Sequence, residues 1–497
     1  MKGLYLGTAF TILGAQYAAA GPLFEDHSAN LPKHVYAGGW EHFVGGGLAV
    51  FDCNGDALPD IFAAGGENPA RLIRNAGGFT FKAVDIPELL GVTGAYPIDL
   101  DADGILDLFV LRVGQNQVLK GAGNCRFTDA TQAMGIVPDD DWSTAFTAWW
   151  EDDDQRPTLA IGNYVDRDDP DGPFRACDDN VILRPADRGY QAELLQPGFC
   201  PLSLLAAKDS RGRSTLRLSN DRHYYVSGGH EQMWDIKDRR FLDASDGWEN
   251  VALWGMGIAS RDLNGDGLDE VMLTSMGDQL LQFALPGGGY DAADYSLGSY
   301  AQRPHVGDDG RPSTGWHAEF GDIDNDARAD LFIAKGNVDQ MPGMAMNDPN
   351  TLLNQNADGS FTEVSVAAGV ATMERSRGAA LADFDLDERL DLIVSNRRAA
   401  LEIYRNITPQ TGNWITVDVA QDGGNRNAIG AVITVTSGAL TQSKQHVIGG
   451  GHAGGQMLPH HFGLGDGTDA LVSVLWPDGT TTQTQIDAGT RLLITKP

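Results

Sequence analysis

One pattern of polar and apolar positions recurs along the chain. Carboxylate or amide side chains stand at positions 1, 3, 5 and 9 and are followed directly by a short apolar segment. The clearest copy runs from Asp383 to Asp391 and is followed by LIVSN, and other copies begin at Asp52, Asp99, Asp262 and Asp322. Because five copies of so specific a pattern do not arise by chance, we interpret them as internal repeats.

Two weaker copies lie in the wide gap between the second and third of the clear ones. They begin at Trp150 and Ala207, lack most of the carboxylates and keep the apolar segments LAIGN and LRLSN. Seven repeats then follow one another at intervals of 47 to 61 residues. A period of this length predicts a propeller or solenoid array. Short strands joined by Gly-rich turns favour four-stranded blades, so we predict an all-β chain with a seven-bladed β-propeller.

The propeller is expected to span residues 21–409, with an irregular insertion at 164–203. The segment from Phe24 to Ser28 resembles an outer strand and is expected to complete the seventh blade, which removes a sheet edge. A disordered N-terminus is the alternative. Residues 410–497 alternate between apolar and polar positions in the strands WITVDVA, AVITVTS, SKQHVIG, LVSVLWP and RLLITK. This pattern predicts a separate C-terminal β-sandwich.

The repeated loops present the oxygen ligands that Ca²⁺ prefers, and about five structural Ca²⁺ ions are expected. An acidic turn that caps its own backbone is the alternative for a single copy. Mg²⁺ is the second choice of ion, because its octahedral geometry suits such a loop poorly. The candidate ligands are Asp52, Asn54, Asp56, Asp60, Asp99, Asp101, Asp103, Asp107, Asp262, Asn264, Asp266, Glu270, Asp322, Asp324, Asp326, Asp330, Asp383, Asp385, Asp387 and Asp391.

The net charge of the chain limits the classes of molecule that we expect it to bind. The 497 residues include 68 acidic and 36 basic side chains, for a formal net charge of −32. Nucleic-acid phosphates and anionic lipids require Lys and Arg, so neither is expected as a partner. An acidic chain of this kind is suited to binding cations.

Residues 1–20 have the three parts of a secretory signal. Lys2 is followed by an apolar run over residues 4–13 and by three alanines that end at Ala20, where cleavage is expected. A buried first strand is the alternative. No later stretch has the apolar length of a membrane span, so we expect a secreted or periplasmic protein.

Four cysteines in an exported chain predict disulfides, with three possible pairings. Cys177 and Cys200 bracket a Pro-containing segment and form the natural pair, which would leave Cys53 with Cys125. Metal ligation by the cysteines is the weaker interpretation, because no CxxC spacing occurs.

The innermost strands of a propeller begin at the mouth of its channel, where ligands commonly bind. The candidate pocket residues there are His42, Trp254, Trp316, His317, Glu319, Arg375 and Arg377. They could bind a sugar or a carboxylate, or serve an enzyme of the polysaccharide lyase or dehydratase type. Ordinary packing is the favoured alternative, because no catalytic motif accompanies them. We interpret His460 and His461 as structural or surface residues and not as transition-metal ligands.

The loops with their flanking strands resemble the FG-GAP/VCBS repeats of integrin-alpha-type propellers. In the C-terminal segment, the run from Asn425 to Ala431, the strand VITVTSG, the run from His461 to Gly465 and VLWPDG are similar to the ASPIC/UnbV domain. Together these motifs resemble the cartilage acidic protein family. The resemblance implies a calcium-bound scaffold that serves as an exported protein- or glycan-binding or adhesion module. The weaker loops at 150–158 and 207–215 depart from the pattern, so no Ca²⁺ is expected there.

Overall fold

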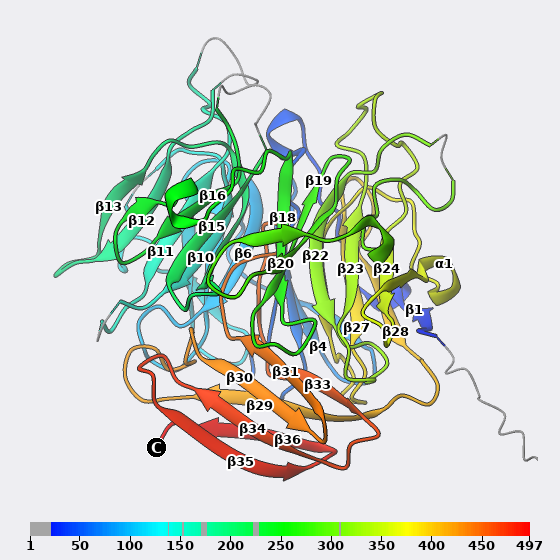
Figure 1. The fold of residues 1–497 in the computed structure, drawn as a ribbon. Helices are drawn as coiled ribbons and strands as arrows, with labels where there is room; N and C mark the ends of the chain where they lie inside the picture. Colours follow the sequence, from blue (N-terminus) through cyan, green and yellow to red (C-terminus); the bar gives the residue numbers. More distant parts are fainter. Residues whose placement is uncertain (1–20, 138, 152–153, 170–175, 222–227, 308–309) are drawn as a thin grey trace, which may run out of the picture.

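The computed structural model describes residues 21–497, except 138, 152–153, 170–175, 222–227 and 308–309 (Figure 1). The expected signal sequence, residues 1–20, lies outside the described residues. Strands make up most of the regular structure, and the described α-helix, α1 (Ser365–Ala368), has four residues. The chain is therefore all-β, as the repeated pattern predicts.

Seven sheets are each built on four antiparallel strands; six of them take these strands in sequence order, one of the six gains a fifth, parallel strand, and the seventh takes its outer strand from the N-terminus. The first sheet contains β2 (Leu48–Phe51), β3 (Asp60–Ala63), β4 (Arg71–Asn75) and β5 (Phe81–Val84), and the second contains β6 (Val92–Ile98), β7 (Asp107–Arg112), β8 (Gln117–Gly121) and β9 (Phe127–Asp129). The third contains β10 (Ser143–Trp149), β11 (Thr158–Asn163), β12 (Asn180–Pro185) and β13 (Tyr190–Leu195). The fourth contains β14 (Pro201–Lys208), β15 (Ser214–Asn220), β16 (Gln232–Asp235) and β17 (Arg240–Phe241). The next two are β18 (Gly255–Arg261), β19 (Glu270–Ser275), β20 (Leu280–Ala284) and β21 (Tyr290–Ala292), and β22 (Gly315–Gly321), β23 (Asp330–Lys335), β24 (Thr351–Gln355) and β25 (Phe361–Glu363).

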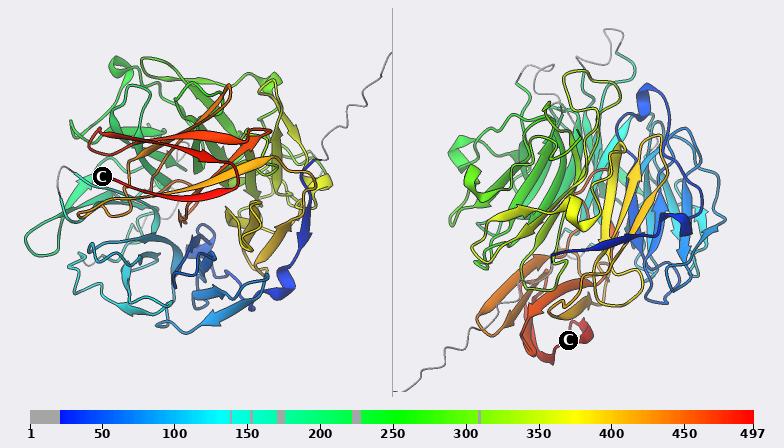
Figure 2. Two further views of the ribbon diagram at one scale, coloured as in Figure 1. Left: turned by 90° about the horizontal axis from the view of Figure 1, so that it is seen from below. Right: turned by 90° about the vertical axis from the view of Figure 1, so that its right-hand side faces the viewer.

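The last sheet joins the two ends of this region. It comprises β26 (Ser376–Ala382), β27 (Asp391–Asn396), β28 (Glu402–Asn406) and the N-terminal β1 (Phe24–Asp26), which pairs with β28. The prediction that the N-terminal segment completes the seventh repeat is confirmed by the pairing of Phe24 with Asn406. The first strand of each sheet contacts that of the next, and β26 contacts β2 (Figure 2). The arrangement is consistent with a repeat β-propeller.

The core lies between adjacent sheets. First strands such as β6, β10 and β26 are buried along their whole length, because sheets pack on both of their faces. Phe109 and Phe146, from neighbouring sheets, stack with ring centroids 4.4 Å apart. The apolar segments that follow each loop in the sequence therefore form these contacts.

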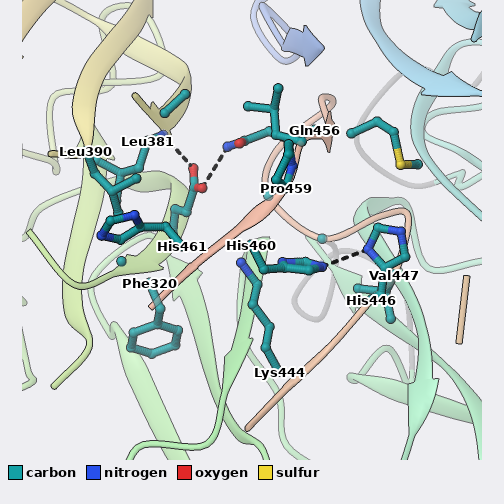
Figure 3. A pocket seen from close by; sticks show the side chains of 18 of the residues that line it. Phe320, Leu381, Leu390, Lys444, His446, Val447, Gln456, Pro459, His460 and His461 are labelled. Carbon is teal, nitrogen blue, oxygen red and sulfur yellow. Dashed lines mark hydrogen bonds between the residues drawn. The ribbon is translucent and has the colours of Figure 1, made fainter. Parts of the chain in front are cut away.

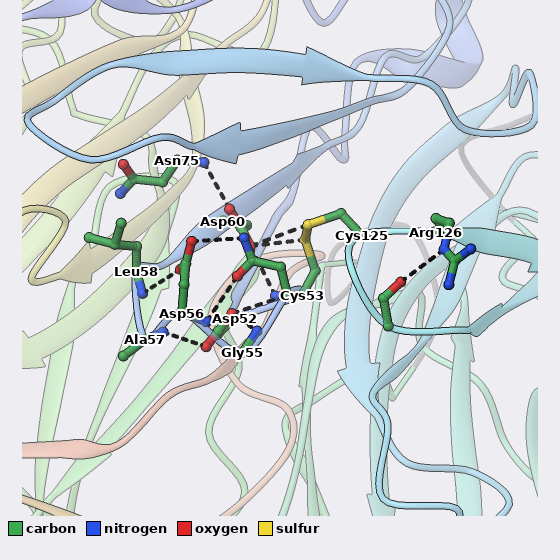
Figure 4. The surroundings of a disulfide bond; sticks show 12 residues. Asp52, Cys53, Gly55, Asp56, Ala57, Leu58, Asp60, Asn75, Cys125 and Arg126 are labelled. Atoms are coloured by element: carbon green, nitrogen blue, oxygen red, sulfur yellow. Dashed lines mark hydrogen bonds between the residues drawn. A yellow bond between two sulfur atoms is a disulfide. The ribbon is translucent and has the colours of Figure 1, made fainter.

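Both expected disulfides are present, Cys53–Cys125 and Cys177–Cys200. The first joins the loop after β2 to the hairpin before β9, and so links two neighbouring sheets (Figure 4).

The predicted insertion at 164–203 is too long. Residues 180–195 within it form β12 and β13, the regular outer strands of the third sheet. The Pro and acidic residues between β11 and β12 interrupt the alternation of apolar and polar positions, so these two outer strands were not recognised in the sequence.

The C-terminal region packs two sheets. One contains β29 (Asn413–Ala420), β33 (His460–Gly465) and β36 (Thr490–Thr495); the other contains β30 (Val432–Ser437), β31 (Leu440–Gln445), β34 (Asp469–Leu475) and β35 (Thr481–Asp487). Their inner faces share one apolar core that includes Phe462, Val472 and Trp476. This sandwich lies below the seven sheets in Figure 1, across one face of the ring of sheets.

The strand predicted over SKQHVIG ends early, at Gln445. The following Gly-rich residues, 448–457, instead enter the space enclosed by the innermost strands; we call them the axial segment. Bridges pair Ile448 with β10, Gly449 with β14, Gly451 with β18 and Gly454 with β6. The short strand β32 (Gln456–Met457) pairs in parallel with β2. The axial segment therefore completes backbone hydrogen bonding for five of the seven sheets.

His452 fixes the tip of the axial segment. Its Nε2 accepts a hydrogen bond from the Gly45 N–H at 3.1 Å, and its Nδ1 therefore donates to the Met256 carbonyl at 3.1 Å. The backbone N–H of His452 donates to His317 Nδ1 at 3.1 Å. Burial lowers the pKa of His452 to about 3, so the ring is neutral. Its role is structural.

Candidate metal centres

The five predicted loops share one backbone conformation. Each connects the first and second strands of its sheet, and positions 4 and 6 of each loop have positive φ. Glycine provides this conformation in some loops, but Ala57, Asn325, Leu386 and Glu388 adopt it in others. The left-handed residues fold the chain into a tight turn that brings position 9 back toward position 1. The spacing of the carboxylates therefore predicts this loop conformation better than the presence of glycine does.

Hydrogen bonds hold the first and last carboxylates of each loop. The carboxylate at position 1 accepts from the N–H of position 6, as between Asp322 Oδ2 and Ala327 at 2.8 Å. The carboxylate at position 9 accepts from the N–H of position 2, and in four loops also from the third strand. Asp330, for example, accepts from the N–H groups of Ile323 and Gln355 at 3.0 and 2.9 Å. These carboxylates are therefore fixed in place by the backbone.

Three loops bring carboxylates from positions 1, 3 and 9 together. In each group, one oxygen per residue lies within 4.8 Å of the others, and the groups are Asp99, Asp101 and Asp107; Asp322, Asp324 and Asp330; and Asp383, Asp385 and Asp391. The loops at Asp52 and Asp262 have the same turn but do not form such a group in the described residues. A grouping of Cys53, Cys125 and Asp60 offers no thiolate, because the two sulfur atoms form a disulfide.

Several carboxylate oxygens in these loops are buried without a hydrogen-bond partner in the described chain. They are Asp99 Oδ1, Glu270 Oε1, Asp324 Oδ1 and Asp385 Oδ1. An unpaired buried carboxylate oxygen costs free energy unless a proton or a cation reaches it. Hard oxygen ligands around one point are the donor set that Ca²⁺ binds, so the residues present fit this ion.

Burial and mutual repulsion raise the pKa of the carboxyls at positions 1 and 9 of the three groups. Burial raises the pKa of Asp107 to about 7, and burial together with the charge of Asp324 raises that of Asp330 to about 8. Burial also raises the pKa of Glu270 to about 8. Burial is also the main cause of the raised pKa values of Asp322 and Asp391. A divalent cation would remove this electrostatic cost.

Basic side chains reach the outer carboxylates of the same loops. Lys120 pairs with Asp101 and with Asp103, the latter at 2.8 Å, and Arg405 pairs with Asp385 at 2.7 Å. In the weaker copy at 207, Arg213 pairs with Asp209 at 2.7 Å. Part of the weaker copy at 150 lies outside the described residues, and there Glu151 pairs with Arg184. Arg213 therefore neutralises the carboxylate of the turn that begins at Ala207.

The loop face of the sheets carries the C-terminal sandwich. Arg491 Nη2 pairs with Asp383 at 2.9 Å, Ser443 Oγ donates to Asp262 at 3.1 Å, and His461 Nε2 lies 2.6 Å from Asn325 Oδ1. The backbone N–H of Gly465 donates to the Asn325 carbonyl at 2.8 Å. Sequence reasoning missed these residues because they contact the loops only through the tertiary fold. The loops therefore position the sandwich, in addition to any ion that they bind.

The predicted channel-mouth residues do not form one pocket. Trp316 and Arg377 are buried, with the guanidinium carbon 3.9 Å from the Trp ring centroid. Arg377 donates to the backbone carbonyls of Phe43, Ser376 and Val338. His42 is buried in a 3₁₀ turn (Trp40–His42). Trp254 and Arg375 directly precede β18 and β26. His317 and Glu319 line a different cavity, on the loop side.

Comparison with known proteins matches both parts of the chain. Residues 421–497 match the family model ASPIC and UnbV, and residues 52–110 match the FG-GAP-like repeat model. Cartilage acidic protein 1 of Homo sapiens is 26% identical over 172 residues, which is 34% of this chain and 26% of the human protein. The Mus musculus protein of the same name is 27% identical over 162 residues, or 32% of this chain and 25% of that protein. These matches support the resemblance to the cartilage acidic protein family. The aligned segments span about a quarter of the length of each relative.

Solved structures with a similar arrangement of strands include BBS1N in complex with ARL6DN and Saccharomyces cerevisiae Sqt1. The first has 11% identity and a TM-score of 0.46, covering 80% of this chain and 99% of that one. The second has 12% identity and a TM-score of 0.40, covering 73% and 96%. Similarity at this level does not extend to function. In the described ranges, no helix has the length and apolar character needed to cross a membrane.

Proposed function

We propose that the chain is an exported, calcium-stabilised binding or adhesion module for a protein or glycan. The observation that carries the calcium assignment is the set of buried carboxylate oxygens without hydrogen-bond partners, three of which belong to the three-carboxylate groups. The candidate ligands are the residues at positions 1, 3, 5 and 9 of the five loops. Each ion would hold the first, second and third strands of its sheet at one end.

We further propose that residues 21–409 form a closed seven-bladed propeller and residues 410–497 a docked sandwich. The contact between β26 and β2 and the pairing of β1 with β28 support closure. The two disulfides, which are typical of oxidising compartments, support a secreted or periplasmic location. The FG-GAP-like repeat and the relationship to cartilage acidic protein 1 support a binding role. Neither a nucleic acid nor a membrane span is part of this proposal.

The alternative, a polysaccharide lyase or dehydratase at the channel mouth, gains no support from the described residues. Arg377 is surrounded by backbone carbonyls, and the axial segment fills the space within the innermost strands. A pull-down from envelope extract with residues 21–497, in calcium and after chelation, tests the proposal. We expect a partner retained only in calcium. Catalytic conversion of a saccharide, with no partner retained in the pull-down, would contradict a binding role.

Calcium should stabilise the protein more at high pH than at low pH. The folded carboxyls with raised pKa bind protons that the unfolded chain has released, between about pH 4 and pH 8. Their contribution to stability is therefore present at low pH and is lost as pH rises through that window, unless a cation replaces the proton. We expect the Tm difference between calcium-loaded and metal-free protein to be larger at about pH 8 than at about pH 5. An equal Tm difference at both pH values would contradict this account.

A further inference from the structure

A cavity of about 650 Å³ lies on the loop side of the innermost strands, where the sheets meet the C-terminal sandwich (Figure 3). Strands β14, β18, β22 and β26, the residues around the axial segment and β36 contribute to its walls. Apolar side chains such as Phe320, Leu381, Leu390, Val447 and Pro459 line much of it. Its volume is in the range of small-molecule binding sites.

Two cationic side chains in the cavity wall have unused hydrogen-bond donors. The Lys444 side chain lines the cavity (Figure 3), and no hydrogen bond or ion pair joins its amine to another residue of the described chain. Arg261 is 3% exposed and its Nε has no partner among the described residues. Its other contacts are a 3.3 Å hydrogen bond to Gln442 and the ring of Phe462, 5.0 Å from the guanidinium carbon.

Four acidic side chains lie near these cations, and each already accepts hydrogen bonds; Asp322 and Asp262, which face Arg261, accept from the backbone of their own loops. Glu319 accepts from Gln456 Nε2 at 2.6 Å and from the Leu381 N–H at 3.1 Å, and lies 3.5 Å from His317 Nε2. Asp269 accepts from Gln445 Nε2 at 3.1 Å and from Ser260 Oγ at 3.3 Å. The carboxylates therefore leave the donors of Lys444 and Arg261 unsatisfied.

The histidines of the cavity supply no negative charge. His446 Nδ1 lies 2.8 Å from His460 Nε2, so the two rings share one hydrogen bond. Burial lowers the pKa of both rings and keeps them neutral. Burial, followed by the charge of Arg261, also lowers the pKa of Lys444 to about 8. An anion would relieve the cost of desolvating the buried Arg261 and the half-buried Lys444.

We propose that this cavity binds an organic carboxylate with an apolar body, held by Lys444 and Arg261. The two carboxylate oxygens would accept from the Lys444 amine and the Arg261 guanidinium, in charge-assisted hydrogen bonds. The apolar body would occupy the part of the cavity lined by Leu381, Leu390 and Pro459. This ligand site is separate from the channel mouth and does not depend on turnover.

Titration of butanoate, octanoate and decanoate into the calcium-loaded protein by calorimetry tests the proposal. We expect saturable one-site binding that strengthens from butanoate to octanoate, with no binding of octanol. The Lys444→Met variant should weaken octanoate binding roughly ten- to a hundredfold, the loss typical of a charge-assisted hydrogen bond. It should fold at least as well as the parent chain, because it removes an uncompensated buried charge. Lys496→Met is the matched control, since Lys496 pairs with Asp478 at the surface.

Three results would overturn the proposal. They are an absence of saturable binding across the series, octanol binding as tightly as octanoate, and Lys444→Met binding octanoate with parental affinity. Should Lys444→Met fail to fold, the carboxyl ¹³C resonance of labelled octanoate on the parent protein decides. The bound carboxyl should stay ionised to a lower pH than the free acid, because it lies beside two cations. A higher pKa in the bound state would refute the site.

Discussion

Replacing Asp324 with alanine should have opposite effects on stability with and without calcium. In calcium, Asp324→Ala should lower the free energy of unfolding by about 2 to 3 kcal/mol, the contribution of a cation site filled at about a hundred times its Kd. In chelator the same variant should be as stable as the parent chain or more stable. The reason is that Asp324 crowds Asp322 and Asp330, and its Oδ1 lacks a hydrogen-bond partner in the described chain.

Urea denaturation in the two buffers measures both effects. Asp358→Ala is a suitable control, because the Asp358 carboxylate is exposed, accepts from Ser360 within the turn between β24 and β25, and is not one of the 1-3-5-9 side chains. It should change stability equally in calcium and in chelator. A decrease for Asp324→Ala of the same size in both buffers would mean that Asp324 acts only within the turn. Asp385→Ala should repeat the pattern in the last loop, since Asp385 Oδ1 is also without a partner there.

Replacing Gly94 with alanine should detach or strain the axial segment. A Cβ atom at Gly94 would lie 1.6 Å from the Ala453 carbonyl oxygen, a backbone atom that cannot rotate away. Gly94 does not have positive φ, so β6 itself tolerates alanine and the cost falls on the contact with the axial segment. We expect a loss of about 3 kcal/mol, the upper part of the range for overpacking a core.

Hydrogen exchange over residues 448–457 locates the effect of Gly94→Ala. Amides that donate to the innermost strands, such as those of Gly450 and Gly451, should exchange faster than in the parent chain. Gly343→Ala is the control, since a Cβ there meets nothing within 4 Å and its φ is not positive. Gly47→Ala should act like Gly94→Ala, because its Cβ would lie 1.8 Å from the same oxygen. Parental stability and protection in both variants would contradict the axial contacts.

Much of the fold follows from the period of the sequence. The 1-3-5-9 carboxylates mark where each first strand ends and each second strand begins, because the position-9 side chain starts β3, β7, β19, β23 and β27. The likeness of the segment from Phe24 to Ser28 to the outer strands located the N-terminal strand that completes the last sheet. The outer strands β12 and β13 escaped prediction because Pro and Asp residues interrupt the alternation around them.

The axial segment and the cavity could not be predicted in the same way. The pattern of residues 448–457 is dominated by glycine, which carries no periodicity and indicates only a close approach of backbones. Its partners lie on five different sheets, and contacts of that kind are determined by the assembled fold. Lys444 likewise stands in an ordinary alternating strand, and its unpaired amine becomes apparent only when the sandwich meets the sheets. Of the predicted channel-mouth residues, His317 and Glu319 line the cavity, whereas Trp316 and Arg377 are buried against each other and do not line it.

The number of calcium ions bound per chain distinguishes a calcium-stabilised scaffold from acidic turns that hold no metal. The parent chain and Asp324→Ala, purified in calcium and passed through metal-free buffer, would be measured by mass spectrometry of the metal against protein concentration. The account predicts at least three ions per parent chain, one for each three-carboxylate group, up to five if every loop with the 1-3-5-9 pattern is filled. Asp324→Ala should hold one ion fewer. A parent chain that retains no calcium, or a variant with an unchanged count, would contradict it.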